Sequence, residues 1–172
     1  LQRYGFGAEW LAAVNNMLEH CRRQPLHNTI SLSDLPANQR LPEMAFMLHT
    51  EGFRLADVQN WFTQTQPPLP DNIRQAAQRL NFQDLQGYLN GFIDLTCQDQ
   101  HGHVFVIDYK SNHLGNHAEA YNQAAMNEAV AEHHYYLQAL IYAVAVARYY
   151  RARQHPLPAV HIRYWFLRGL NG

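Results

Sequence analysis

Hydrophobic residues recur every three or four positions in several stretches of the chain, which is the period of one face of a helix. The predicted helices are residues 7–21, 54–63 and 132–154, with a further helix at 71–80 that has Asp71 as its cap. The segment 132–154 is the strongest of these predictions, because no Gly or Pro occurs in it before Pro156. Its apolar stripe consists of Leu137, Leu140, Ile141, Val144 and Ala147.

Alternation of apolar and polar residues predicts strands at residues 41–50, 86–98 and 160–167. In the second of these strands, the alternation assigns Ile93 and Leu95 to one face and Asp94 to the other. Residues 104–109 are apolar on both faces, as expected of a buried central strand.

The segments between these elements are predicted to be connections. Residues 25–40 are rich in Asn, Ser and Pro and are expected to form a loop, and residues 112–127 are a polar connection that ends in a helix. The order of elements is therefore helix, strand, strand, strand, long helix, strand. This order predicts an α/β fold with a mixed central β-sheet flanked by helices.

The composition is that of one globular domain over residues 1–172, with 47% hydrophobic and 16% charged residues. The sequence has no apolar run of membrane-spanning length and no signal peptide, which predicts a cytoplasmic protein without a membrane contact. Both ends lie within patterned sequence, so we expect the chain to be a fragment of a larger protein. The two cysteines are too few for a disulfide framework or a zinc site.

The net charge of −1 does not indicate that the chain as a whole binds nucleic acid. The charge is unevenly distributed, however, because residues 148–172 contain five arginines and no Asp or Glu. This basic segment suits phosphate contacts, or equally a solvated helix end at which arginines are favourable.

Two carboxylates and a lysine stand at the ends of two otherwise apolar strands. Residues 99–103 are predicted to form a hairpin with a three-residue loop in which Gly102 is left-handed. In this register Asp94 lies opposite Asp108 on one face, and Lys110 shares that face. Opposed carboxylates destabilise a sheet unless something positive lies between them, and a divalent cation is the natural candidate. The alternative is a structural ion pair at a strand end.

Three motifs in this order resemble those of the RecB-type nuclease domains of the PD-(D/E)XK superfamily. They are residues 91–94 (Gly-Phe-Ile-Asp), 107–112 (Ile-Asp-Tyr-Lys-Ser-Asn) and 138–142 (Gln-Ala-Leu-Ile-Tyr). The likeness continues from the N-terminal helix to residues 165–169 and covers nearly the whole chain. It implies a restriction-endonuclease-like core, in a single nuclease domain of the kind found in the C-terminal part of the exodeoxyribonuclease V beta subunit.

The resemblance also implies a role for each motif residue. The metal ligands that it implies are Asp94, Asp108 and the main-chain carbonyl of Tyr109. Lys110 would be the catalytic lysine, and Gln138 and Tyr142 would complete the site from one face of a helix, four residues apart. The implied cofactor is Mg²⁺, with Mn²⁺ as a substitute.

In one respect the chain departs from the family pattern. The family usually supplies a further metal ligand, a His on a helix upstream of the region present here, so we expect the fragment alone to be weak or inactive. Glu43 occupies the position where some relatives place an auxiliary acid, and is otherwise an exposed strand-end residue.

The leading hypothesis is a Mg²⁺-dependent deoxyribonuclease domain of the exodeoxyribonuclease V type. It would hydrolyse single-stranded DNA, or strands unwound by a helicase, in double-strand-break repair and recombination, with RecC-type and RecD-type subunits as partners. The alternatives are a catalytically silent module of the same fold, which binds DNA or docks a subunit, and a free-standing endonuclease. A silent relative typically loses one of Asp94, Asp108 and Lys110, and this chain retains all three.

Overall fold

A four-stranded mixed sheet forms the centre of the protein, whose computed structural model describes residues 3, 5, 7–51, 53–82 and 87–170. Its strands, in spatial order, are β3 (Arg40–His49), β4 (Tyr88–Gln98), β5 (Val104–Lys110) and β6 (Val160–Phe166). The pairs β3–β4 and β4–β5 are antiparallel, whereas β5 and β6 are parallel. The predicted α/β fold with a mixed sheet is therefore confirmed, and β5 is the central buried strand that its sequence predicts, with Val104 to Ile107 at most 1% exposed.

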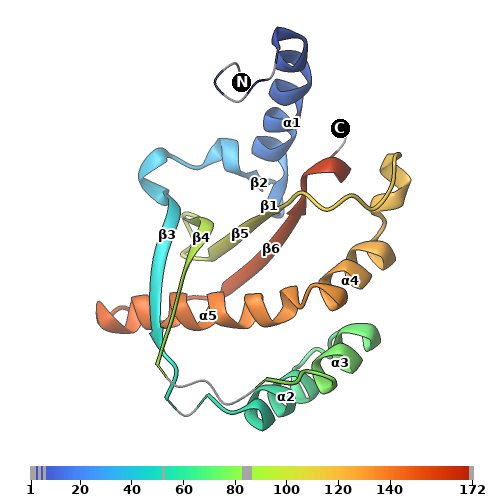
Figure 1. Cartoon of the computed structure of the whole chain (residues 1–172). Helices are drawn as coiled ribbons and strands as arrows, with labels where there is room; N and C mark the ends of the chain where they lie inside the picture. Colours follow the sequence, from blue (N-terminus) through green and yellow to red (C-terminus); the bar gives the residue numbers. More distant parts are fainter. Residues whose placement is uncertain (1–2, 4, 6, 52, 83–86, 171–172) are drawn as a thin grey trace.

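Helices flank the sheet (Figure 1). The helix α5 (Tyr135–Ala152) lies across one face. On the opposite face, called the α1 face below, the core includes Cys21, the one buried residue of α1 (Leu11–Arg23). This helix follows the short 3₁₀ helix η2 (Ala8–Trp10), and most of its length projects away from the sheet. Beyond α5, a further cluster of buried residues joins it to α2 (Leu55–Gln64), α3 (Asp71–Gln78) and α4 (Gln123–Glu132). None of the described helices is both long and apolar enough to cross a membrane.

Residues 25–40 are more ordered than the predicted loop. They contain a small antiparallel pair, β1 (Pro25–His27) with β2 (Ile30–Ser31), followed by the 3₁₀ helices η3 (Leu32–Asp34) and η4 (Ala37–Gln39). The side chains of Ser31 and Asp34 form a capping box, and Leu26, Leu32 and Leu35 are buried against α1 and the sheet. These buried leucines make the segment part of the core on the α1 face.

The predicted helix 132–154 is α5, which spans Tyr135–Ala152. It begins at Tyr135 rather than at residue 132 because His134 has a left-handed backbone with φ of 54°, which separates α5 from α4. The helix α4 is the one in which the connection 112–127 is predicted to end. The connection before α4 contains the 3₁₀ helix η5 (Ala118–Tyr121), and η6 (Leu167–Gly169) follows β6. The side chain of Asp71 is also not a cap as predicted, because Pro70 is the N-cap and Asp71 is the first helical residue, paired with Arg74.

The predicted alternation along β4 is wrong at Asp94. Ile93 packs in the cluster on the α5 face, whereas Leu95 packs in the cluster on the α1 face. Directly across on β3, Glu43 has a positive φ of 52° and interrupts the ladder between the pairs Pro42↔Leu95 and Met44↔Ile93. Because this irregularity shifts which side chains face each helix layer, Asp94 lies at the point where the strand changes face.

Three histidine rings gather at the end of the sheet where the β4–β5 hairpin turns. The rings of His27, His103 and His161 lie 5.3–6.0 Å apart, centroid to centroid. Burial lowers the pKa of His161, and the neighbouring Arg163, His103 and His27 lower it further, while Asp99 opposes them. Asp99 is buried and accepts hydrogen bonds from the main-chain N–H groups of His101 and His103, with its other oxygen 2.9 Å from His103 Nδ1.

We expect this cluster to make stability fall as the pH is lowered from 7 to 5. The unfolded chain protonates His161 near its usual pKa of 6.5, whereas the folded protein does so only at lower pH, so acid favours unfolding over this interval. The pKa of Asp99 is also lowered, and its stabilising contribution is lost only as the pH falls below its ordinary pKa of 3.8.

Urea unfolding at pH 5, 6, 7 and 8 measures how the free energy of unfolding changes with pH. The variant His161→Phe, which keeps a ring beside Phe105, should reduce this change. His113→Gln is the control, because His113 is exposed; an unchanged slope in His161→Phe would contradict this assignment.

Candidate active site

The β4–β5 hairpin has the predicted register. Gly102 is left-handed with φ of 85°, and the loop is closed by hydrogen bonds from Asp99 N to the carbonyl of His103 and from Gly102 N to the carbonyl of Asp99. The paired residues are Gln98↔Val104, Cys97↔Phe105, Thr96↔Val106 and Leu95↔Ile107. The ladder described ends there, immediately before Asp94 and Asp108.

Beyond the last backbone pair, β4 contacts β5 through the side-chain carboxylate of Asp94. Its Oδ2 accepts a hydrogen bond of 2.8 Å from the backbone N–H of Tyr109. The side chain of Tyr109 itself packs in the cluster on the α1 face. Asp94 therefore lies in the opening between the two strands, next to the main chain that connects Asp108 with Lys110.

Asp108 and Lys110 form a buried ion pair. Asp108 is 4% exposed and Lys110 is 8% exposed, and Lys110 Nζ lies 2.6 Å from Asp108 Oδ2. Nζ also donates to Oε1 of Gln138 on α5 at 2.8 Å. Burying two charges is costly unless they are paired and their remaining donors are satisfied, and both conditions hold here.

Gln138 and Tyr142 connect this pair to α5, because they lie four residues apart on one face of the helix. The Tyr142 hydroxyl lies 2.9 Å from Asp108 Oδ1, as donor, and it accepts a hydrogen bond of 2.8 Å from Gln138 Nε2. The same hydroxyl is 3.3 Å from the carbonyl oxygen of Phe92 on β4. Burial, together with the negative charge of Asp108, raises the pKa of Tyr142, so its hydroxyl stays protonated and remains a donor.

Two further residues, which are not among the predicted site residues, contact Lys110. Nζ lies 3.6 Å from the ring centroid of Tyr135, the first residue of α5, and 5.0 Å from that of Tyr164 on β6. Tyr135 could have been found, because it precedes Gln138 by three residues and shares its helix face. Tyr164 could not, because its place beside Asp108 depends on the parallel pairing of β5 with β6.

The donor atoms at this site suit a hard divalent cation, but they are few. Asp94 and Asp108 offer carboxylate oxygens, and the Tyr109 carbonyl lies between them in the chain, a set that Mg²⁺ or Mn²⁺ prefers. Across the described residues, no group of three or more His, Cys, Asp or Glu is arranged to hold a metal ion. Glu43 is exposed, and its left-handed backbone lies across from Asp94. The oxygen chemistry of these residues therefore fits the expected cofactor, with two carboxylates as its protein anchors.

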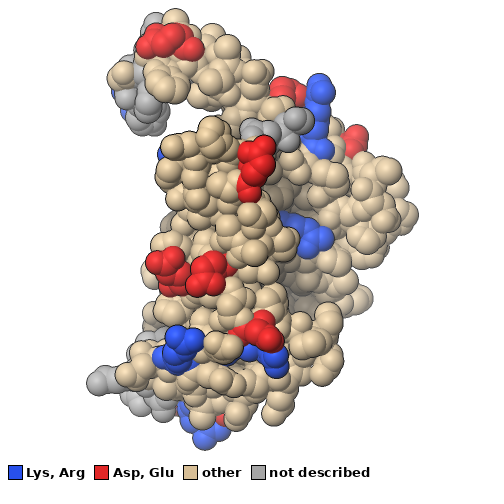
Figure 2. Space-filling model, turned by 90° about the vertical axis from the view of Figure 1, so that its right-hand side faces the viewer, with Lys and Arg blue, Asp and Glu red and all other residues tan. Residues whose placement is uncertain are grey.

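The arginines of residues 148–172 are dispersed. Four of them contact other parts of the protein: Arg148 reaches the carbonyl of His49, Arg153 the ring of Tyr149, Arg163 the carbonyl of Leu26 and Arg168 that of Ser111. On the face drawn in Figure 2, Lys and Arg are interspersed with Asp and Glu, and most of the surface is uncharged. Arg168 lies beside the candidate site, because it donates a hydrogen bond to the carbonyl of Ser111, the residue after Lys110.

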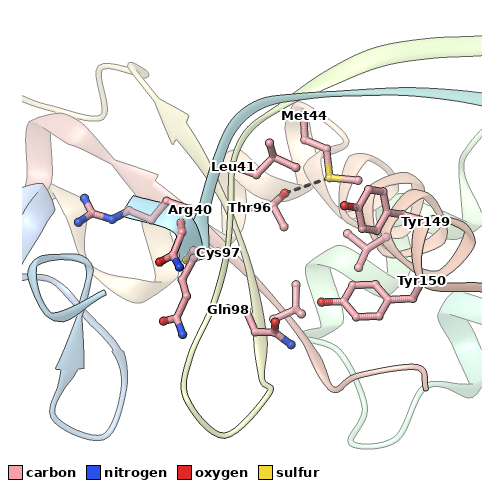
Figure 3. Close-up of a pocket in the computed structure, with 12 residues that line it drawn as sticks. Arg40, Leu41, Met44, Thr96, Cys97, Gln98, Tyr149 and Tyr150 are labelled. Atoms are coloured by element: carbon pink, nitrogen blue, oxygen red, sulfur yellow. Dashed lines mark hydrogen bonds between the residues drawn. The ribbon is translucent and has the colours of Figure 1, made fainter. Parts of the chain in front are cut away.

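An open pocket of about 290 Å³ lies away from these residues. Its lining includes Leu41 and Met44 of β3, Thr96 of β4 and Tyr149 of α5, and it contains no Asp, Glu or Lys (Figure 3). The Thr96 hydroxyl lies 3.5 Å from the Met44 sulfur across it. Without a carboxylate or an ammonium group, this pocket lacks the chemistry that the ion pair at the other end of β5 offers.

Comparison with known proteins agrees with this arrangement. The sequence profile of the PD-(D/E)XK nuclease superfamily matches residues 11–171. The chain is 33% identical to the RecBCD enzyme subunit RecB of Escherichia coli over 99% of its own length, and 31% identical to that of Haemophilus influenzae over 93%. A third relative, RecB of Mycobacterium tuberculosis, is 33% identical over 86% of the chain. The chain spans 13–16% of the length of these three relatives.

Proposed function

Because the chain belongs to the PD-(D/E)XK nuclease superfamily, we propose that it is a nuclease domain that hydrolyses DNA phosphodiester bonds with a divalent metal ion. The observation that carries the proposal is the buried group formed by Asp108, Lys110, Gln138 and Tyr142, with Asp94 beside it. A buried structural ion pair would also use Gln138 and Tyr142 to satisfy its remaining hydrogen bonds, but it would not need the second carboxylate, that of Asp94. The alternative of a simple ion pair is therefore the weaker explanation.

Each residue has a distinct role in this proposal. Asp94, Asp108 and the Tyr109 carbonyl would hold Mg²⁺ or Mn²⁺, which when bound polarises the phosphoryl oxygens and lowers the pKa of water. Lys110 orients the attacking water and stabilises negative charge on the phosphoryl group. Tyr142 and Gln138 fix the directions of the Asp108 carboxylate and the Lys110 ammonium, respectively.

The likeness to RecB supports a more specific form of the proposal. Each of these relatives is a subunit of the RecBCD enzyme. We infer that the substrate of this chain is single-stranded DNA or strands unwound by a helicase, in recombinational repair of double-strand breaks. We further infer that Mg²⁺ is the working ion, that RecC-type and RecD-type subunits are the partners, and that the protein acts in the cytoplasm.

One observation favours a second candidate, a silent module of the same fold that binds DNA or docks a subunit. Within the described residues the site has two carboxylates and no third metal-binding side chain. Such a site would hold a cation weakly, since affinity rises with the number of protein ligands. The two candidates predict different outcomes in a cleavage assay.

The test is a cleavage assay on single-stranded and duplex DNA with Mg²⁺, with Mn²⁺ and with EDTA. The chain is assayed alone and, where it is produced as part of a longer polypeptide, within that polypeptide. We expect cleavage that requires the divalent ion, is stopped by EDTA and is faster on single strands. Cleavage that persists in EDTA would contradict the metal-dependent mechanism, and DNA that is bound but uncut under every condition would identify the silent module.

A further inference from the structure

The environment of Lys110 is unusual for a lysine. It is the only lysine of the 172 residues; the other twelve basic residues counted with it are arginines. Its ammonium group contacts Asp108 and Gln138 on one side and two tyrosine rings on the other, with centroids 3.6 Å and 5.0 Å from Nζ. At 8% exposure the ammonium group is largely desolvated, the condition under which cation–π attraction is strongest.

Both rings are held in place by contacts of their own. Tyr164 is the partner of Asp108 in the parallel β5–β6 ladder, and its hydroxyl donates a hydrogen bond of 2.6 Å to the carbonyl of Tyr135. The hydroxyl of Tyr135 donates to Oδ1 of Asn112 at 3.1 Å, and the ring of His133 stacks against that of Tyr135. The left-handed backbone of His134 starts α5 at this position. The rings are therefore fixed by α5, β6 and the segment after β5 together.

The neutral rings of Tyr135 and Tyr164 can attract Lys110 even when Asp108 binds a cation. The oxygens of Asp108 are already shared between Lys110 and Tyr142, and a bound cation would compete for the same carboxylate. If Asp108 holds a cation, Lys110 would lose a charged partner and would be repelled by the positive charge of the ion. The faces of Tyr135 and Tyr164 attract the ammonium group and carry no charge that a cation could draw away.

We propose that Tyr135 and Tyr164 are positioning residues that hold Lys110 over their ring faces, ready to act on the phosphodiester, while Asp108 binds the cation. This inference rests on the proposed function, because it assigns the lysine to that reaction. The proposed role belongs to the aromatic rings and not to the hydroxyl groups, so substitutions that keep the ring can be distinguished from those that remove it. Phenylalanine should replace either tyrosine, and leucine should not.

The first arm of the test is kinetic. In Tyr135→Leu we expect kcat to fall roughly 5- to 30-fold, the range set by a desolvated cation–π contact, with KM for DNA nearly unchanged. Tyr135→Phe should retain most of the activity, and Tyr164→Leu should show a smaller loss than Tyr135→Leu because its ring is farther from Nζ. Tyr149→Leu is the matched control, since that residue faces Arg153 at 3.6 Å near the other end of α5 and should leave kcat unchanged.

The second arm does not depend on activity. Because the chain has one lysine, labelling with ¹³C-lysine gives a single set of side-chain signals in an NMR spectrum. We expect the methylene protons next to Nζ to be shifted upfield by the ring of Tyr135, to stay shifted in Tyr135→Phe, and to return toward the free-lysine position in Tyr135→Leu. Thermal unfolding of each variant establishes that the protein measured is folded.

The two arms separate the two hypotheses. A folded Tyr135→Leu variant with wild-type kcat and an unmoved lysine signal would overturn the positioning role and leave the nuclease proposal standing. A wild-type protein that cuts no DNA with any divalent ion, both alone and within the longer polypeptide, would overturn the nuclease proposal. The lysine signal then decides alone whether the rings position Lys110. Equal losses in Tyr135→Phe and Tyr135→Leu would also overturn the inference, because they would implicate the hydroxyl.

Discussion

Replacing Asp108 with asparagine is expected to abolish metal-dependent cleavage, with a loss of roughly 10³-fold or more. The substitution keeps the shape of the side chain and removes the charge that would anchor the cation, whose contribution to the transition state is several kcal/mol. Alanine at this position should be as inactive and also less stable, by about 3–5 kcal/mol, because it leaves the ammonium group of Lys110 buried without its partner. Asparagine is therefore the cleaner variant for the functional measurement.

Calorimetric titration with Mg²⁺ and Mn²⁺ tests the cause of this loss. We expect the wild type to bind the ion and Asp108→Asn to bind it at least tenfold more weakly. Asp99→Asn is a useful comparison, since Asp99 is likewise a buried acid but lies at the hairpin end of the sheet, and it should leave ion binding unchanged. Unchanged affinity in Asp108→Asn would remove Asp108 from the set of ligands.

Replacing Lys110 with alanine is expected to stop cleavage while leaving DNA binding and ion binding in place. Loss of a group that orients water and stabilises developing charge typically costs about 10²- to 10⁴-fold in rate. Ion binding should be retained or become tighter, because Asp108 is then released from its ion pair. The two substitutions at the pair thus have the same effect on cleavage and opposite effects on the ion.

Cleavage rates with Mg²⁺, and DNA affinity measured with Ca²⁺ to prevent turnover, separate these effects for Lys110→Ala. Arg151→Ala provides the control, since it removes one exposed positive charge near the end of α5. If a folded Lys110→Ala protein cuts DNA at the native rate, the ammonium group has no part in the chemistry. Asp108 and Lys110 would then form a structural ion pair at a strand end, which is the alternative that the sequence leaves open.

Local patterns in the sequence predicted the β4–β5 hairpin and its register from Leu95↔Ile107 to Gln98↔Val104. The three-residue loop and the left-handed Gly102 together fixed the register of β4 and β5, because each residue of a hairpin determines the pairing of the next. The same reasoning predicted that Gln138 and Tyr142 share a helix face, and both contact the Asp108–Lys110 pair. Short-range geometry was sufficient for these residues.

Predictions failed where a single backbone angle or a distant contact decides the structure. Neither Glu43 nor His134 is a residue type that requires a positive φ, so the sequence gives no sign of the face change at Asp94 or of the break between α4 and α5. Tyr164 reaches the site through parallel pairing across a crossover of about 50 residues, which no local pattern encodes. The buried leucines of residues 25–40 pack against Cys21 and the sheet, which are distant contacts. The Asn and Pro content of the segment indicates only a loop.

The parallel pairing of β5 with β6 has a consequence for biosynthesis. A nascent chain that has emerged only as far as Lys110 carries both acids and the lysine, but lacks the tyrosines and the glutamine that hold them. A further 54 residues, through Tyr164, must be translated before the chain contains all the neighbours of the ammonium group. Under the proposed function, the catalytic group is therefore complete only after the crossover has folded back onto the sheet.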